Sequence, residues 1–283
     1  MTLDLGFTGD VMLGRGVDTA QRRRPSDAVW GDLHERLRTL DGLFVNLECC
    51  LSTRGTPAEG RPFHFRADPD WAVRALEGAG VDWCALANNH LMDFGPEALA
   101  DTVEALDRAD IAHAGAGESA AVAEAPALVT VGDLSVGLVS FTDNTPAFAA
   151  GPATPGTAHV TFDVDDAESR RAVAEALDGA RARDPDLLVA SLHWGPNMET
   201  DPPEEFRTFG RWLVDRGVDE DVIATEGLAS EEPAETVLAD AEAFDIVIVA
   251  EREPTLTGRL TDTIAEKVFR ESTAPVVLVR LPQ

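Results

Sequence analysis

Positive charge is scarce in this sequence of 283 residues. Lysine and arginine total 23 against 51 aspartates and glutamates, which gives a formal charge of −28, and Lys267 is the single lysine. Nucleic acids and anionic membrane surfaces bind proteins through basic surfaces, so we expect neither as a partner. Acidic residues dispersed along a whole chain are typical of salt-loving organisms, because concentrated salt screens their mutual repulsion. An acidic partner-binding protein is the alternative to this halophilic interpretation.

Tyrosine is absent and cysteine is rare. The three cysteines, Cys49, Cys50 and Cys84, are odd in number and two are adjacent, which excludes a disulfide framework and fits a reducing compartment. The N-terminus has neither the basic nor the apolar region of a secretion signal. No uninterrupted apolar run reaches the roughly 18–20 residues that span a bilayer. We therefore predict a cytoplasmic location.

Short apolar runs alternate with helical stretches along the chain, and this order predicts an α/β protein with a layered sheet. The predicted strands are Leu3–Thr8, Leu43–Leu47, Val81–Ala87, Ala127–Val131, Ser135–Phe141, Leu187–Leu192, Val222–Thr225, Ile246–Val249 and Val276–Val279. The predicted helices are Asp27–Thr39, Pro69–Ala79, Pro96–Ala109, Asp165–Arg183, Glu204–Arg216, Pro233–Ala243 and Leu260–Glu271. Gly- and Pro-rich loops are expected at Thr53–Arg61 and Thr145–Thr157, and the second either rims a substrate site or is a plain surface loop.

Polar side chains follow four of the predicted strands at their carboxyl ends. They are Asp10, Glu48, the pair Asn89 and His90, and His193. Ligands of open α/β sheets bind at that edge. Carboxylate, amide and imidazole groups together suit Mn²⁺, Fe²⁺, Zn²⁺ or Mg²⁺. Each residue taken singly has an equally good structural explanation, such as a cap, a turn or a core hydrogen bond, but their joint position favours a metal site.

Six motifs in series carry a family resemblance, namely GDVMLGR, FVNLE, FHFRA, LANNHLMDFG, FTDN and SLHWGPN. They resemble the CapA family, which is named for poly-γ-glutamate capsule synthesis and is similar in fold to the calcineurin-like metallophosphoesterases. The resemblance covers residues 3–217 and implies a layered α-β-β-α sandwich. It also implies a metal-dependent hydrolase of the phosphoesterase type that uses a metal-activated water.

The resemblance assigns roles to these strand-end residues. Asp10 would bind the first metal, Glu48 would bridge two metals, Asn89 would bind the second, and His193 would be a further ligand. The cofactor would be one or more divalent ions, Mn, Fe, Zn or Mg.

Two catalytic and two binding roles follow from the same resemblance. His90 would protonate the leaving oxygen, and Asp93 would orient His90. Arg15 and Arg66 would bind an anionic substrate, either small or polymeric, because guanidinium groups match phosphates and carboxylates.

The sequence departs from the family pattern after the last motif. The family closes its site with a Gly-His-x-His-type loop, which would follow a strand shortly after Asp219, yet no histidine follows His193 here. The expected two-metal site therefore lacks two imidazoles. A working enzyme with an incomplete site and a non-catalytic protein that retains the pocket both remain open.

The C-terminal residues resemble a second family. Residues 218–283 look like the C-terminal half of a universal stress protein, through IVIV, IAEKV and APVVLVR, and predict a βαβαβ segment. The loop before the IAEKV helix has one glycine, Gly258, and acidic residues that would repel phosphate, so we predict no ATP binding.

Two incomplete domains are therefore predicted, a CapA-like domain over residues 1–217 and a stress-protein-like segment over residues 218–283. We interpret the junction as a fusion or a truncation. A sheet edge left unpaired there would promote a homodimer through the C-terminal segment. A stress-protein-like interaction module is the third functional alternative.

Overall fold

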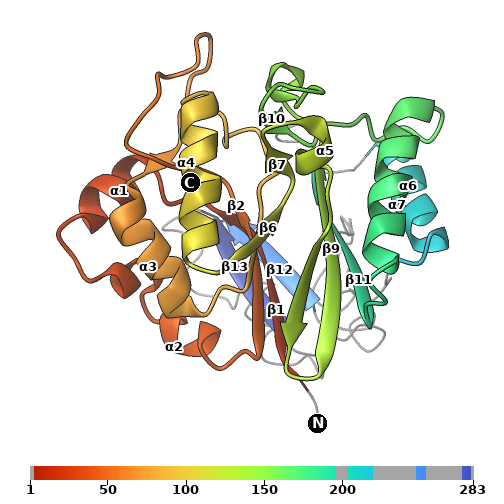
Figure 1. Ribbon diagram of the computed structural model, residues 1–283. Coiled ribbons are helices and arrows are strands. Elements are labelled where there is room, and N and C mark those ends of the chain that lie inside the picture. Colours follow the sequence, from red (N-terminus) through yellow and green to blue (C-terminus); the bar gives the residue numbers. More distant parts are fainter. Residues whose placement is uncertain (1–2, 196–202, 219–246, 253–275, 282–283) are drawn as a thin grey trace. The chain divides into compact units, whose positions relative to one another are not determined.

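The chain divides into two units, which we describe separately. The first comprises Met1–Met198 with Pro203–Val218, and the second comprises Glu199–Pro202 with Asp219–Gln283. The structure is a computed structural model that describes residues 3–195, 203–218, 247–252 and 276–281 (Figure 1).

Two sheets form the centre of the first unit. The first sheet has the order β1-β2-β5-β6 with all strands parallel, and the second has the order β11-β9-β8, in which β11 and β9 are parallel and β8 and β9 antiparallel. Their bounds are β1 Leu5–Val11, β2 Gly42–Leu47, β5 Trp83–Ala85, β6 Ala112–Ala114, β8 Ala127–Val131, β9 Leu134–Thr142 and β11 Leu187–His193. Strand β6 contacts β8 and β9, so the two sheets meet there.

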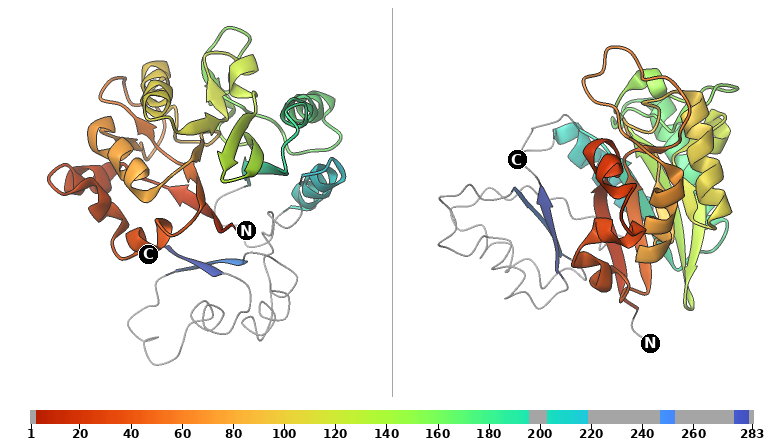
Figure 2. Two further views of the ribbon diagram at one scale, coloured as in Figure 1. Left: turned by 60° about the horizontal axis from the view of Figure 1, so that its bottom comes forward. Right: turned by 90° about the vertical axis from the view of Figure 1, so that its left-hand side faces the viewer.

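Helices cover both outer faces of the paired sheets. Those described are α1 Arg15–Gln21, α2 Leu33–Leu37, α3 Pro69–Ala79, α4 Pro96–Arg108, α5 Ala120–Ala123, α6 Ala167–Arg181 and α7 Glu204–Asp215. Helices α1 to α4 lie beside the β1 sheet, and α6 and α7 lie side by side beyond the β11 sheet (Figures 1 and 2). The predicted layered α/β fold is therefore confirmed. Within the described part, no helix combines the length and the apolar character that crossing a membrane requires.

Short elements complete the first unit. Its two-residue strands are β3 Cys50–Leu51, β4 Arg66–Ala67, β7 Ala116–Gly117 and β10 Gly156–Thr157, and its 3-10 helices are η1 Ser26–Trp30 and η2 Pro146–Phe148. Strands β3 and β4 pair in parallel, and β10 pairs antiparallel with β7. The predicted loop at Thr145–Thr157 therefore contains η2 and β10.

Strand β2 lies at the centre of the core, and all six of its residues are buried. Neighbouring strand β1 pairs with it in parallel, but the register shifts between Phe7 and Asp10. Such a bulge re-aims the side chains that follow it. It places Asp10 opposite Asn46, at the edge where both strands end.

Helix α3 begins and ends where its sequence predicts. Asp68 accepts a hydrogen bond from the Asp70 amide at 3.0 Å, Pro69 occupies the first turn, and Gly80 closes the helix with a left-handed φ of 82°. The predicted helix Asp27–Thr39 is wrong as one element. Gly31 has φ 53° and ψ −136°, outside the helical region, and separates η1 from α2.

The predicted strand Ala127–Val131 has the same bounds as β8, and the other predicted elements of this unit are present with shifted ends. The predicted strand Leu3–Thr8 continues to Val11, whereas the predicted strand Val81–Ala87 retains only β5. Strand β5 starts late because the Val81 amide still bonds the carbonyl of Leu76 at the end of α3, and it stops early because Asn88 turns back to Leu86.

The second unit is described through two strands. β12 (Val247–Arg252) and β13 (Val276–Leu281) pair in parallel, from Val247 opposite Val276 to Arg252 opposite Leu281. They correspond to the predicted strands Ile246–Val249 and Val276–Val279. The predicted strand Val222–Thr225 and helices Pro233–Ala243 and Leu260–Glu271 lie outside the described residues, so the likeness to a universal stress protein stays a prediction.

Asp18 on α1 connects this helix to the start of α3 through hydrogen bonds, whose contribution to stability can be measured. Its Oδ1 accepts hydrogen bonds from the Asp68 amide and from Trp71 Nε1, both at 2.9 Å, and Arg22 pairs with its Oδ2 at 2.7 Å. We expect Asp18→Ala to lower the free energy of unfolding by about 2 kcal/mol, because it leaves two donors without an acceptor. Chemical denaturation measures this, with the exposed Asp70→Ala as the matched control.

The loss should also depend on pH. Burial acts to raise the pKa of Asp18, but the Trp71, Arg22 and Asp68 hydrogen bonds outweigh it and lower that pKa. Because the pKa of Asp18 is lower in the folded protein, the ionised carboxylate stabilises the fold at pH values above its unfolded pKa of about 4. This stabilisation is lost as the pH falls through the pKa of the folded protein. The difference in free energy of unfolding between wild type and Asp18→Ala should therefore become smaller in acid. A difference that does not change with pH would contradict this account.

Candidate metal centre

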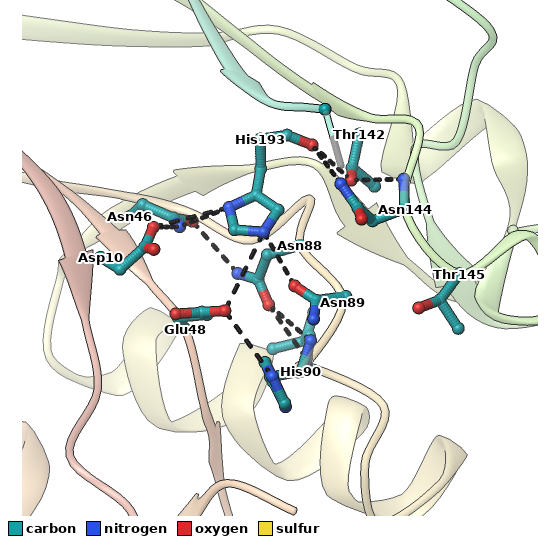
Figure 3. Close-up of polar contacts among 12 residues, drawn as sticks. Asp10, Asn46, Glu48, Asn88, Asn89, His90, Thr142, Asn144, Thr145 and His193 are labelled. Carbon is teal, nitrogen blue, oxygen red and sulfur yellow. Dashed lines mark hydrogen bonds and ion pairs between the residues drawn. The ribbon is translucent and has the colours of Figure 1, made fainter. Parts of the chain in front are cut away.

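Three side chains from three strands converge at one edge of the first unit. They are Asp10 on β1, Glu48 directly after β2, and His193 at the end of β11 (Figure 3). His193 Nδ1 lies 3.5 Å from Asp10 Oδ1, and His193 Nε2 lies 3.9 Å from Glu48 Oε1. One candidate ligand atom from each residue lies within 4.8 Å of the others. We call these three residues the metal cluster.

Asn89 reaches the metal cluster from the loop after β5. Its Oδ1 accepts a hydrogen bond from His193 Nε2 at 2.8 Å. The preceding residue has a structural role instead: Asn88 Oδ1 accepts the amides of His90 and Leu91, and its Nδ2 donates to the carbonyl of Leu47 at 2.9 Å. The four residues predicted as metal ligands are therefore together in space.

His90 is held in one orientation beside the metal cluster. Its Nδ1 donates to Asp93 Oδ2 at 2.6 Å, and its ring stacks on Phe65 with 3.7 Å between ring centres. The other ring nitrogen, Nε2, lies 3.7 Å from Glu48 Oε1. Asp93 is fully buried and also accepts the Phe65 amide at 2.7 Å. The contact predicted between Asp93 and His90 is thus present, with Nε2 facing the metal cluster.

The two predicted substrate-binding arginines lie differently. The exposed Arg15 places its guanidinium 4.6 Å from the ring centre of Phe63 and 5.9 Å from that of Phe65, the ring that stacks on His90. Arg66 lies 3.9 Å over the ring of Phe94 and donates to the carbonyl of Arg54 at 2.9 Å. Arg15 is therefore one aromatic ring away from His90, whereas the contacts of Arg66 hold it against Phe94.

Asn46 is a site residue that sequence reasoning assigned no role. Its Nδ2 donates to Asp10 Oδ1 at 2.6 Å and lies 3.2 Å from His193 Nδ1, while its Oδ1 accepts from Asn88 at 3.1 Å. The signal was a lone amide in the otherwise apolar strand β2. This side chain links β1, the loop after β5, and β11 across the site.

Arg61 is a second site residue for which the sequence predicted no role. It pairs with Asp93 at 2.9 Å and donates to the carbonyl of Asn89 and to the hydroxyl of Thr145. Nothing in the sequence marks it, because it is one of two arginines, with Arg54, in a Gly- and Pro-rich loop. The contact with Thr145 brings the start of the predicted Thr145–Thr157 loop to the site.

The carboxylates of the metal cluster influence each other strongly. Burial, with the nearby negative charge of Asp10, raises the pKa of Glu48 to about 8. Burial acts to raise the pKa of Asp10 as well, but the hydrogen bond and positive charge of His193 outweigh it and lower that pKa. The same contact raises the pKa of His193, against the opposite effect of burial. Acidic groups this close need a counter-charge, and a divalent cation would supply it.

The donor set fits such an ion. Two carboxylates, one imidazole and one amide oxygen are ligands that Mn²⁺, Fe²⁺ and Zn²⁺ accept, and all four come from backbone fixed by strands or by the Asn88 turn. The single imidazole in this set agrees with the absence of any histidine after His193.

Comparison with known proteins identifies the family. Residues 4–224 match the family model described as bacterial capsule synthesis protein PGA_cap. The "Probable polyglutamine synthesis accessory protein Rv0574c" of Mycobacterium tuberculosis is 32% identical, over 75% of this chain and 65% of that protein. The "Capsule biosynthesis protein CapA" of Bacillus anthracis is 28% identical and the "PGA biosynthesis protein CapA" of Bacillus subtilis 26% identical, each over 77% of this chain and over 52% and 55% of those proteins.

The similarity has defined limits. This chain spans between 52% and 65% of the length of these three relatives. The predicted resemblance of residues 3–217 to the CapA family is confirmed, because the family model matches more than half of the chain. The chain therefore belongs to the family of bacterial capsule synthesis proteins, PGA_cap.

Proposed function

We propose that this protein is a metal-dependent hydrolase of the phosphoesterase type that serves poly-γ-glutamate synthesis. The observation that supports it most is the convergence of Asp10, Glu48 and His193, with Asn89 in contact and His90 beside them. The names of the relatives refer to polyglutamine synthesis, capsule biosynthesis and PGA biosynthesis, which supports the process to which we assign the chain.

The metal would be held by Asp10, Glu48, Asn89 and His193. When bound, such an ion lowers the pKa of a water molecule and polarises the oxygen of the group under attack. Asn46 contributes by fixing the Asp10 carboxylate and by facing His193 Nδ1, so that both side chains keep their orientation.

His90 would protonate the leaving oxygen. Its Nδ1 is occupied by Asp93, and the Phe65 ring covers one face of the imidazole, so Nε2 is the nitrogen turned toward the metal cluster. An imidazole fixed in this way is oriented to donate a proton from Nε2.

The substrate would be an anion, small or polymeric. The chain has a formal charge of −28, so an anionic substrate needs a cation close to the site to offset the overall repulsion. Arg15 fits this role because it stacks on Phe63 beside Phe65, close to His90. Arg66 fits it less well because its guanidinium lies against Phe94.

The proposal is tested with full-length protein purified in molar KCl and stripped of metal with a chelator. Titration calorimetry with Mn²⁺, Zn²⁺ and Mg²⁺ should show binding of at least one ion. The loaded protein should then hydrolyse an aryl phosphate monoester or diester. Absence of binding for all three ions would contradict the proposal.

A binding protein that retains the pocket is the second candidate. The observation that favours it is that no histidine follows His193, so the family's two closing imidazoles are missing. Metal binding without turnover of either ester, under conditions in which an anionic ligand still binds, would select this candidate.

The second unit gives a separate prediction, self-association. Strands β12 and β13 pair with each other in parallel, and the edge of such a sheet is a surface that a strand of another chain can extend. We expect sedimentation equilibrium in molar KCl to show a dimer of the full chain and a monomer of a variant ending at Gly217. Equal self-association of both would rule out dimerisation through residues 218–283.

A further inference from the structure

Arg61 joins three separate segments of the chain beside the candidate site. Its Nε lies 2.9 Å from Asp93 Oδ1, its Nη2 donates to the carbonyl of Asn89 at 2.6 Å, and its Nη1 donates to Thr145 Oγ1 at 3.0 Å. Its side chain is 18% exposed. Because each nitrogen faces a different segment, the contacts fix the plane of the guanidinium as well as its position.

The partner of Arg61 is the carboxylate that orients His90. Asp93 is completely buried, and its other oxygen accepts both His90 Nδ1 and the Phe65 amide. A buried carboxylate is stable only when it is paired and hydrogen-bonded, and Arg61 supplies the permanent positive charge. The position of the His90 ring therefore depends on Arg61 through Asp93.

The third contact of Arg61 reaches the opposite wall of the site. Thr145 has φ 53° and ψ 70°, a left-handed conformation that is uncommon for a β-branched residue and is kept only where surrounding contacts enforce it. The Arg61 guanidinium also lies 5.0 Å from the ring centre of Phe148. Just before Thr145, Asn144 donates to the carbonyl of His193 at 3.3 Å. Arg61 thus links the His90 side of the site to the His193 side.

We propose that Arg61 is a positioning residue that holds the proton donor His90 and the 143–148 loop in a fixed relation to the metal cluster. The proposal rests on the hydrolase function proposed above. It predicts that positioning His90 requires the planar guanidinium of Arg61, and not its charge alone. A lysine ammonium is a point charge that cannot contact Asp93, Asn89 and Thr145 together.

The same loop provides a matched control. Arg54 is also paired with an aspartate, Asp101, through two of its nitrogens, but its side chain is 61% exposed and, within the described part of the chain, it contacts none of His90, Asn89 and Thr145. Arg54→Met removes the same charge as Arg61→Met from the same loop, without touching the candidate machinery.

The first arm of the experiment uses the metal-free full chain. We expect Arg61→Met to shift the imidazole NMR signals of His90, and Arg54→Met to leave them in place. In unfolding experiments Arg61→Met and Thr145→Val should be non-additive, because they share one contact. Unchanged His90 signals together with additive effects would overturn the proposal.

The second arm measures hydrolysis of the aryl phosphate by the Mn²⁺-loaded chain. Arg61→Met should lower kcat roughly 10- to 100-fold with little change in KM, as expected for a group that orients a catalytic side chain. Arg61→Lys keeps a charge for Asp93, so it should fold even if Arg61→Met does not, yet it should not restore kcat. A wild-type kcat in Arg61→Lys, with unshifted His90 signals, would overturn the proposal.

The two arms separate this proposal from the proposed function. If the wild-type chain hydrolyses no ester while the His90 signals still respond to Arg61→Met, the hydrolase function fails and the positioning role stands. If the wild-type chain is active and neither kcat nor the His90 signals respond to Arg61→Met, the positioning role fails alone.

Discussion

Replacing Asp10 with alanine is expected to weaken Mn²⁺ binding by roughly 100-fold or more, which corresponds to about 2.7 kcal/mol. Asp10 supplies a carboxylate to the metal cluster, and its lowered pKa keeps it ionised without a metal. In wild type, saturating Mn²⁺ should raise the thermal midpoint of unfolding, because a ligand of the folded state stabilises it. In Asp10→Ala this rise should largely disappear, and calorimetry and thermal denaturation measure the two effects.

A control variant separates ligand loss from charge loss. Asp133 is exposed in the turn between β8 and β9, at the opposite end of β9 from the site, so Asp133→Ala changes the net charge equally. We expect its Mn²⁺ affinity to equal that of wild type. If Asp10→Ala retained wild-type affinity and the full metal-induced rise, Asp10 would not be a ligand and the hydrolase proposal would fail.

Replacing His90 with alanine is expected to reduce hydrolysis of an aryl phosphate by roughly 100- to 10,000-fold, the range for loss of a general acid. Metal binding should remain close to that of wild type, because His90 contacts the metal cluster only through the 3.7 Å approach to Glu48. The loss should appear mainly in kcat. It should also be smaller for esters with good leaving groups, which need little protonation.

The matched control for this variant is His113→Ala. His113 pairs with Asp107 at 3.1 Å, away from the metal cluster, and should be dispensable for hydrolysis. Circular dichroism must confirm that His90→Ala is folded, because the substitution removes a stacking contact and one partner of Asp93. An equal loss of rate for esters with good and poor leaving groups would contradict a proton-donor role.

Local sequence determined the regular elements where its signals agreed. Helix α3 has a capping aspartate, a proline in its first turn and a closing glycine, and its predicted bounds match the structure. The Asp27–Thr39 prediction failed because Gly31 adopts φ 53°, and apolar spacing alone does not reveal such a break. The two-residue strands, such as β7 and β10, depend on pairing with a distant segment and have no pattern of their own.

Parallel topology explains why distant ligands were predicted together. Asp10 and Glu48 lie at the carboxyl ends of β1 and β2, which are neighbouring parallel strands and share an edge. His193 ends β11 in the second sheet, so its place beside the two carboxylates depends on how the sheets meet. Strand order does not determine which side chains fill the space between the ligands, so Asn46 and Arg61 were left without a role.

The sequence by itself determined the family, the layered α/β fold and the residues at the strand ends, because these depend on local patterns and on motifs in series. Only the tertiary structure decided that Arg61, and not Arg66, holds Asp93, because the two arginines lie five positions apart in the sequence and nothing local distinguishes them. Only the tertiary structure also shows that Asn46 bridges Asp10 and His193. The physical reason is that the partner of a loop cation or a buried amide is set by the packing of distant segments, and the residues adjacent in the chain do not encode it.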